Sequence, residues 1–294
     1  MRLIAATVLA LLCAGLLLVG CGTSKETVAT TVAATTTSAA AAPPRLAVGV
    51  VGPLQVTVPG VKVVHGSLRT LAGLPLVLVS SSRTGAKTLA AVARREPRGH
   101  YALVGGSTEA ERQPNLAGLV FREDQAARLA GLVAGHVVSD NAGASPRVAW
   151  IGPQERSLAA GATRGLHSVV PDATMLRQWT SRVPARCKEG ALAAISRGAT
   201  VLIAHGGLCG EAVANAAHEQ GLVGLQLGDF ELPSVAANWV ASEAEHGIYH
   251  GDGDVVFGLR SGALGVGRLD PAIPAAVAVQ ARAAVQELVG GLAP

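Results

Sequence analysis

The residues of this chain that could do chemistry gather in one short segment, His-Gly-Gly-Leu-Cys-Gly at 205–210, between an apolar run and an alanine-rich stretch. A strand, glycine loop and helix of this kind can cradle a phosphate, present Cys209 as a nucleophile activated by His205, or line a ligand site. The segment does not have the phosphate-binding spacings GxxxxGK[ST] or GxGxxG. Cys209 has Gly207 two residues before it but Glu211 two residues after it, which departs from a nucleophile elbow. We therefore favour a ligand-lining loop and a structural cysteine, which are compatible.

The N-terminal segment MRLIAATVLALLCAGLLLVGCG has Arg2 as its only charge, then an apolar run, and a small residue directly before Cys21. An apolar run of this kind is typical of a secretory signal peptide, and a cysteine after the small residue resembles the lipobox of bacterial lipoproteins. The resemblance implies that residues 1–21 are a signal peptide ending in the lipidated Cys21, whose acyl chains (palmitate, for example) hold the protein at the cell membrane. The alternative is an uncleaved anchor helix. Both place the rest of the chain on the extracytoplasmic face.

Composition separates a tether from a folded body. Residues 22–44 are rich in Thr, Ala and Ser and end in two prolines, so burial cannot offset the entropy of ordering them. We expect a flexible tether there. The body, 45–294, is long enough for two lobes with cores of their own.

The charge pattern bears on the class of partner. The formal net charge is +4, and basic residues are spread along the chain with acids between them. Aromatic residues make up only 3% of the chain, and no run dense in Lys and Arg carries interleaved aromatics. We therefore expect no nucleic-acid partner.

Two of the four cysteines, Cys187 and Cys209, lie in the body. An even pair in an oxidising compartment predicts a disulfide. Each cysteine follows one of two successive predicted strands, so a bridge would fasten two neighbouring loops and would contribute about 3 kcal/mol through loop closure. The spacing contains no CxxC and is a poor zinc signature, so we expect no metal site.

Short apolar runs alternate with helical segments throughout the body. We expect strands at 45–52, 62–67, 74–82, 100–107, 115–121, 147–153, 173–180, 199–207 and 222–229, and helices at 88–97, 122–140, 157–170, 188–198 and 210–221. This alternation predicts an α/β fold with parallel sheets covered by helices. The two successive batches of elements predict one lobe at about 45–120, a second at about 121–232, and a crossover and C-terminal return over 233–294.

Ligands of open parallel sheets bind beyond the carboxyl ends of the strands. We take as ligand-binding candidates residues at or directly after the carboxyl ends of predicted strands, together with a tryptophan in the segment expected to pass between the lobes: Ser107, Gln154, Trp179, His205, Gly206, Gln226, Asp229 and Trp239. Several have plainer alternatives. Trp179 is either a platform on which a planar ligand stacks or a side chain of the core. Asp229 and Glu231 either accept hydrogen bonds from the ligand or are solvated acids of a loop.

The order of segments resembles the basic membrane protein family of bacterial substrate-binding lipoproteins, whose members include purine-nucleoside receptors of ABC importers. The resemblance is carried by NLAGLVFREDQAARLAGLVAG, by RVAWIGP with AAGATRGLHSVVPDA, by the segment from CKEGALAAISRG to LVGLQLGD, and by the tail GDVVFGLRSGALGVGRLDPAIPAAVAVQARAAVQELVGG. It covers roughly residues 115–294, with a weaker match over 74–107. It implies a periplasmic-binding-protein-like type I fold, with two lobes that close on a small solute.

The family resemblance also implies partners, and the chain departs from the family in places. The implied partners are a small-molecule solute, the permease and ATPase subunits of an ABC importer, and the membrane through the lipid anchor. We expect a monomer with no cofactor and no catalysis. The family's long first helix looks missing after Gly52-Pro53, so the first lobe is expected to be shortened. A family acid is Gln226 here and a family lysine is Ala241, which weakens the nucleoside assignment.

Two other functions stay open. One is a binding or sensor lipoprotein that serves no transporter, with a degenerate ligand cleft. The other is an extracellular hydrolase that uses Cys209 with His205, or one of the many serines, although the chain has no GxSxG and no acid is placed to orient a base.

Overall fold

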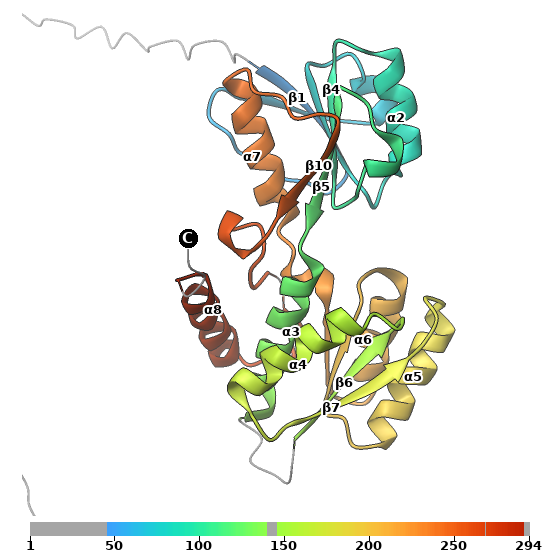
Figure 1. The fold of residues 1–294 in the computed structure, drawn as a ribbon, viewed down its shortest axis with the longest axis vertical. Coiled ribbons are helices and arrows are strands. Elements are labelled where there is room, and N and C mark those ends of the chain that lie inside the picture. The colour runs from blue at the N-terminus through green and yellow to red at the C-terminus, as the bar shows by residue number, and fades with distance from the viewer. Residues whose placement is uncertain (1–45, 140–145, 268, 291–294) are drawn as a thin grey trace, which may run out of the picture. The chain divides into compact units, whose positions relative to one another are not determined.

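The computed structural model describes residues 46–139, 146–267 and 269–290, and these residues build two parallel β-sheets covered by helices (Figure 1). The two-lobe α/β architecture expected from the sequence is confirmed. The predicted signal peptide with Cys21 and the tether at 22–44 lie outside the described residues. In the described part, no helix combines the length and the apolar character that a membrane span needs.

Sheet A belongs to the first lobe and has the strand order β10-β5-β4-β3-β1-β2. Its strands are β1 (Leu46–Val51), β2 (Val61–His65), β3 (Leu76–Ser80), β4 (His100–Val104), β5 (Leu116–Phe121) and β10 (Gly253–Phe257). Helices α1 (Leu68–Leu71) and α2 (Ala86–Arg95) cover one face, and α7 (Pro233–Glu245) covers the other. Because both faces are covered, a strand such as β3, LVLVS, is buried along its whole length.

The connection from β1 to β2, residues 52–60, contains no helix. Parallel neighbours usually need a helical crossover, but here the connecting segment lies along α7. The Gln55 N–H donates to Ser234 Oγ (3.0 Å), the Thr57 N–H donates to Asn238 Oδ1 (2.8 Å), and the side chains of Leu54 and Val56 are buried. Polar side chains of α7 thus satisfy the backbone of the segment that replaces a helix, and the first lobe is shortened as expected.

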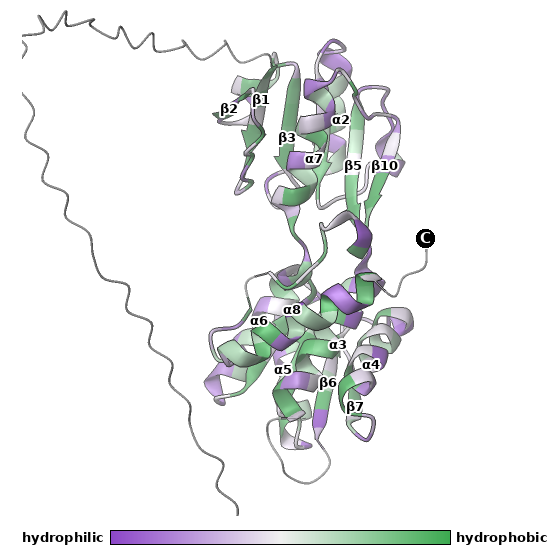
Figure 2. Cartoon of the chain, turned by 90° about the vertical axis from the view of Figure 1, so that its left-hand side faces the viewer, coloured by the Kyte–Doolittle hydropathy of each residue, from purple (hydrophilic) through white to green (hydrophobic). Residues whose placement is uncertain are grey.

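Sheet B belongs to the second lobe and has the order β7-β6-β8-β9. Its strands are β6 (Arg147–Gly152), β7 (Thr174–Trp179), β8 (Val201–Ala204) and β9 (Val223–Gln226). Along β6, Ala149 and Ile151 face α5 (Pro184–Ser196) and α6 (Gly207–Glu219) in one apolar cluster. Val148 and Trp150 face the opposite way, into the core that contains α3 (Glu123–Ser139) and α4 (Arg156–Val169). Helix α8 (Ala275–Gly290) packs on α3, and Figure 2 shows the mixed apolar and polar surfaces of these helices.

Helices α3 and α4 cross at very short distance because glycines stand at the contact. A side chain at Gly165 would overlap the carbonyl oxygen of Arg128, and a side chain at Gly131 would overlap that of Ala162. Backbone therefore meets backbone at this crossing, which fixes where α3 begins relative to sheet B.

One expectation about the elements was wrong. The segment with Trp239 was expected to pass between the lobes, but it lies within α7. Pro233 occupies the first turn, and the buried Ala236, Val240 and Ala244 recur every four residues, which is helical periodicity. The chain instead passes between the lobes at three places, which we call the crossings. They lie at 121–123 between β5 and α3, at 226–233 between β9 and α7, and at 257–275 between β10 and α8.

Candidate functional site

The carboxyl edge of sheet B collects polar side chains from four segments of the chain. Glu155 follows β6, His205 follows β8, Glu231 follows β9, and Glu123 opens α3 directly after β5. Because β6 and β8 are neighbouring parallel strands, the residues that follow them meet at one edge. The tight packing of α3 on α4 brings the start of α3 to the same place.

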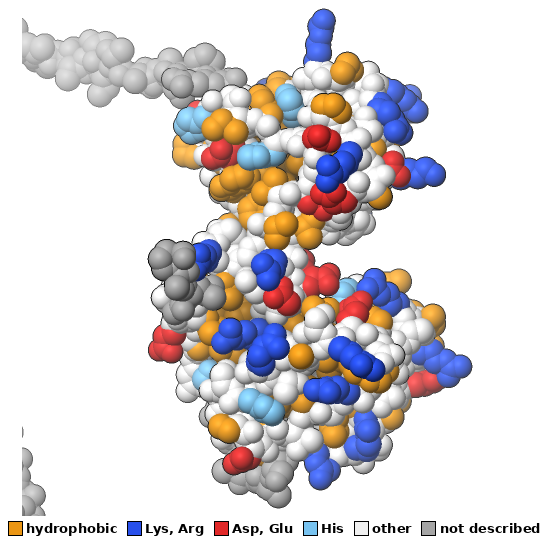
Figure 3. All heavy atoms as spheres, in the orientation of Figure 1, with side chains coloured by type: hydrophobic (Ala, Val, Ile, Leu, Met, Phe, Trp, Pro, Cys, Tyr) orange, Lys and Arg blue, Asp and Glu red, His pale blue; other side chains and the backbone are white. Residues whose placement is uncertain are grey.

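Three of these residues form what we call the His205 cluster: Glu123, Glu155 and His205. The His205 Nε2 atom lies 3.6 Å from Glu123 Oε1 and 3.8 Å from Glu155 Oε2. All three atoms lie within 4.8 Å of one another. The side chains of His205 and Glu155 are 19% and 29% exposed, so the cluster is partly shielded from water. Acidic and histidine side chains are visible together on the face drawn in Figure 3.

Charge pairing sets the protonation of the cluster. Pairing with Glu123 raises the pKa of His205 above its ordinary value, more than burial lowers it. The same pairing lowers the pKa of Glu123. Arg182, from the loop after β7, holds the other oxygen of Glu155, with an Nη2 to Oε1 distance of 2.7 Å. Pairing therefore favours the charged forms of both His205 and Glu123.

Glu231 stands beside this cluster in an unusual state. Burial, together with repulsion from Glu123, raises the pKa of Glu231 to about 7. At neutral pH this carboxyl group can either donate or accept a hydrogen bond, which suits recognition of a polar solute.

Two predicted site residues, Gln226 and Asp229, are engaged with each other. The Gln226 N–H donates to Asp229 Oδ2 (2.8 Å), and the two residues form a reciprocal cap on the turn η2 (Leu227–Phe230). Burial raises the pKa of Asp229. The sequence predicted that both residues lie at the carboxyl end of β9 and contact the ligand. Their side chains instead cap the turn that leads to Glu231.

The other predicted residues are distributed over both lobes. His205 and Gly206 lie at the edge of sheet B, with exposed Gln154 next to Glu155. Trp179 is half-buried at the end of the edge strand β7 and packs partly against the core. In the first lobe, Ser107 is exposed and its Oγ accepts from the Glu109 N–H (3.2 Å). Trp239 contacts the rings of His250 and Phe257, at 4.7 and 5.6 Å between ring centres.

A disulfide fastens the loop that carries His205. Cys187 in α5 and Cys209 in the first turn of α6 are bridged, with a Cα–Cα distance of 5.5 Å. Gly207, at φ +74°, lets the backbone turn from His205 into α6. With its sulfur in the bridge, Cys209 has no thiol to serve as a nucleophile, so the hydrolase mechanism that needs this thiol loses its central group.

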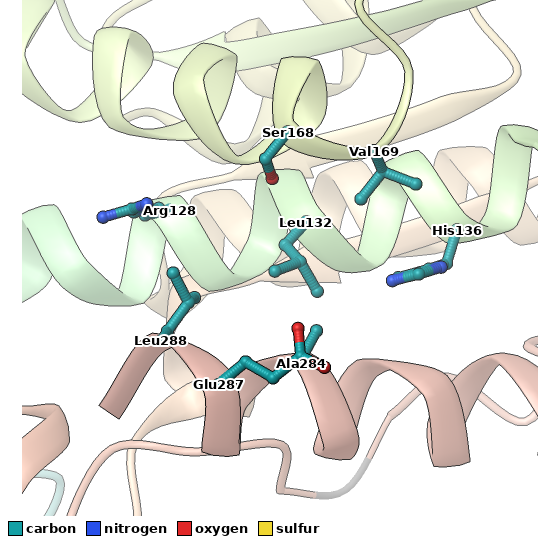
Figure 4. A pocket seen from close by; sticks show the side chains of 8 residues that line it. All are labelled: Arg128, Leu132, His136, Ser168, Val169, Ala284, Glu287 and Leu288. Atoms are coloured by element: carbon teal, nitrogen blue, oxygen red, sulfur yellow. The ribbon is translucent and has the colours of Figure 1, made fainter. Parts of the chain in front are cut away.

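A cavity of about 530 Å³ lies elsewhere, between α3, α4 and α8 (Figure 4). Arg128, Leu132 and His136 project into it from α3, and Glu287 faces them from α8. Helices alone form its walls. The strand ends of sheet B do not line it, so the rule that places ligands at those ends does not select it.

Sequence reasoning missed Glu123 and Glu155. Glu123 lies in the first turn of the helix predicted at 122–140, where the helix dipole alone favours an acid, so it does not stand out as a ligand-binding residue. Glu155 directly follows the predicted Gln154. Applying the strand-end rule to the end of β5 as well, where α3 begins, would have found Glu123.

No family model matches the chain, and no curated protein matches it. Among solved structures, an ABC transporter solute-binding protein from Conexibacter woesei is 18% identical and has a TM-score of 0.58, over 85% of this chain and 98% of the other. A solute-binding protein from Aeropyrum pernix K1 is 19% identical with a TM-score of 0.50, over 83% and 86%. A transcriptional activator of the comK gene from Bacillus halodurans is 14% identical with a TM-score of 0.54, over 84% and 98%. The chain has the periplasmic-binding-protein-like type I fold.

In the type I fold, the carboxyl edges of both parallel sheets present loops that follow strands. In sheet A of this chain, Ser80 ends β3 and Ser82 lies in the loop after it, with their Oγ atoms 2.8 Å apart, and Arg83 follows. In sheet B the loops carry the His205 cluster and Glu231. The strongly polar half of the candidate site is therefore the half in the second lobe.

Proposed function

We propose that this protein is a lipid-anchored, extracytoplasmic solute-binding protein that delivers a small polar solute to an ABC importer. The observation that carries the proposal is the partly shielded edge of sheet B, where Glu123, Glu155, His205 and Glu231 converge from four segments of a type I fold. Two solved structures with this fold are named as solute-binding proteins. The lipobox-like sequence at Cys21 supports the anchor.

Capture would proceed by closure of the lobes on the solute. A solute that contacts both sheet edges favours the closed state by its additional contacts there. The importer's permease would then recognise the closed form, and the solute would leave chemically unchanged. Nucleosides are the first class to test, because the chain resembles the basic membrane protein family over residues 115–294.

A thermal-shift screen tests the binding function. Nucleosides, sugars, amino acids and amines are added separately to residues 45–294 in a buffer that contains EDTA. A solute present at 100 times its Kd stabilises the native state by about 2.7 kcal/mol. The binding role is supported if one class raises the Tm and if Glu231→Ala reduces that rise. If no solute of any class changes the Tm, the binding function is wrong, and if only nucleosides fail, the nucleoside assignment alone is wrong.

Metabolic labelling tests the anchor. Cells that express the full chain should incorporate labelled palmitate into it and retain it in the membrane fraction, whereas Cys21→Ser should abolish both. Labelling that survives this substitution would contradict lipidation at Cys21.

A sensor that serves no transporter is the second candidate. It is favoured by the missing helix between β1 and β2 and by the similar fold of a transcriptional activator. Uptake assays separate the two candidates. Loss of solute uptake on deletion of the gene supports transport, and unchanged uptake with a changed transcriptional response to the solute supports sensing.

A further inference from the structure

The spacing of the donor atoms in the His205 cluster is unusual for direct ion pairs. Charged hydrogen bonds between nitrogen and oxygen measure about 2.7–2.9 Å. The distances from His205 Nε2 to Glu123 Oε1 and Glu155 Oε2 are 3.6 and 3.8 Å. The three side chains thus surround a common space without closing on one another. Donor atoms that share a metal at about 2.0–2.2 Å stand about 3–4 Å apart, which is the separation observed for these two pairs.

The type of donor narrows the class of cation. One imidazole nitrogen and two carboxylate oxygens suit borderline divalent ions of the first transition row, such as Zn²⁺. Ca²⁺ and Mg²⁺ prefer oxygen ligands alone, and Cu⁺ prefers sulfur. The donors come from α3, from the loop after β6 and from the loop after β8, so no single flexible segment supplies the site. The disulfide at Cys209 holds the last of these loops in place.

A second observation, independent of the acids, points to a ligand at this place. Trp150 is completely buried, yet its indole Nε1 finds no hydrogen-bond partner among the described residues. A Cβ built on Gly152 would lie 3.9 Å from Trp150 Nε1, 3.8 Å from His205 Cβ and 3.9 Å from the His205 backbone nitrogen, so the indole N–H lies close to the residue that carries the imidazole. Glu155 Oε2 is also enclosed without a hydrogen bond. A buried donor and a buried acceptor left unpaired in this way cost free energy unless a further group satisfies them.

We propose that Glu123, Glu155 and His205 bind one divalent transition-metal cation, represented by Zn²⁺. The three side chains supply the protein ligands, and a metal-bound oxygen, from water or from a solute, accepts the Trp150 N–H. Arg182 holds the second oxygen of Glu155 and so orients this ligand from outside the site. The inference rests on the proposed solute-binding function in one respect, because the metal lies where the solute is proposed to bind.

Zinc titration of the protein alone tests the site. The body is purified without a histidine tag, stripped with EDTA, dialysed, and titrated with ZnCl₂ by calorimetry. We expect one Zn²⁺ per chain. His205→Gln and Glu123→Gln should each weaken binding at least about tenfold. His246→Gln is the matched control, because His246 is an exposed histidine at the end of α7 and its loss should leave the affinity unchanged.

Measurements on the unchanged chain guard against variants that fail to fold. Addition of Zn²⁺ should shift the ring resonances of His205 more than those of the other histidines, and Co²⁺ should give visible absorption that Zn²⁺ displaces. The proposal is overturned if no stoichiometric binding occurs, if both cluster variants bind zinc as the unchanged chain does, or if Ca²⁺ binds more tightly than Zn²⁺. Binding of putrescine at His205 without binding of Zn²⁺ would also overturn it and would identify an organic cation instead.

The metal and solute experiments can fail separately. Zinc binding at the cluster with no response to any solute, either in EDTA or with Zn²⁺ bound, supports the metal site and contradicts the solute-binding function. A solute response in EDTA with no zinc binding supports the function and contradicts the metal site.

Discussion

Glu231 shows how burial changes the behaviour of one residue in this fold. The carboxyl group has a pKa of about 7 in the folded chain, against an ordinary value of 4.5. Since the folded state binds its proton more tightly than the unfolded state does, Glu231 increasingly destabilises the fold as the pH rises from about 4.5 to 7. The destabilisation is complete above pH 7 and absent well below pH 4.

Replacing Glu231 by Gln should therefore stabilise the protein in a pH-dependent way. At pH 8 with EDTA we expect the free energy of unfolding to rise by about 1–3 kcal/mol, and at pH 4 we expect no difference. Urea denaturation at both values measures this. Glu211→Gln, which alters an exposed acid on α6, should show no such gain at pH 8. Equal stabilities of the Glu231 variant and the unchanged chain at pH 8 would contradict the prediction.

At the residue scale, sequence reasoning located part of the site. His205 was identified because a glycine loop after an apolar run is a local pattern. The partnership of His205 with Glu123 and Glu155 could not be predicted, because it depends on β8 lying beside β6 and on the place where α3 begins. Asp229 shows the converse: its position was predicted, but its carboxylate caps a turn.

At the element scale, the crossing of α3 and α4 depends on Gly165. Gly165→Ala should force the two backbones apart and lower the free energy of unfolding by about 1–3 kcal/mol or more, as overpacking does. Gly73→Ala is the control, since a Cβ at Gly73 meets no atom within 4 Å. Chemical denaturation of both variants gives the comparison. A Gly165 variant as stable as the Gly73 variant would show that the crossing can relax.

The disulfide between α5 and α6 also stabilises the arrangement of these elements. Cys187→Ser with Cys209→Ser should reduce the free energy of unfolding by about 3 kcal/mol, because the unfolded chain regains the freedom of the closed loop. The same double variant should speed amide exchange at His205 and Gly206, whose loop it releases. Hydrogen exchange read by mass spectrometry measures the second effect, and unchanged exchange there would mean that packing alone holds the loop.

Most elements with a strong local pattern were predicted, but α7 was missed although its sequence carries such a pattern. The apolar runs of sheets A and B and the missing helix after β1 could be predicted from the sequence. Residues 233–245 were assigned to a crossing segment from the family resemblance, although Pro233 and the buried alanines are a local signal for a helix. The pairing of β10 with β5 joins segments far apart in the chain, which no local pattern indicates.

At the scale of the whole molecule, the crossings between the sheets are bonded to one another. The Arg122 N–H donates to the Phe257 carbonyl (2.8 Å), and the Leu259 N–H donates to Gln125 Oε1 (2.8 Å). Glu231 and Leu264 form an antiparallel bridge that joins the crossing at 226–233 to the crossing at 257–275. Because these hydrogen bonds connect the three crossings, we expect the crossings to move together as one hinge when the lobes close on a solute.

Gln125→Ala should loosen this hinge. We expect faster amide exchange at Leu259, a loss of about 1 kcal/mol in the free energy of unfolding, and weaker binding of any solute found in the screen. Gln220→Ala, at the end of α6, should change none of these. Exchange at Leu259 that stays as slow as in the unchanged chain would show that the side chain of Gln125 does not hold the hinge.

The late position of β10 and α7 in the chain has a consequence for how the protein is made. Sheet B is built from residues 147–226 without interruption, so its strands are all available once that stretch has emerged. Sheet A must wait for residues 233–257 before its last strand and the helix on its second face exist. During synthesis or export, the sheet of the first lobe is thus completed after the sheet of the second, and its apolar strands β1 to β5 stay partly uncovered in the meantime. A chain truncated before residue 233 should therefore expose these strands and aggregate through the first lobe.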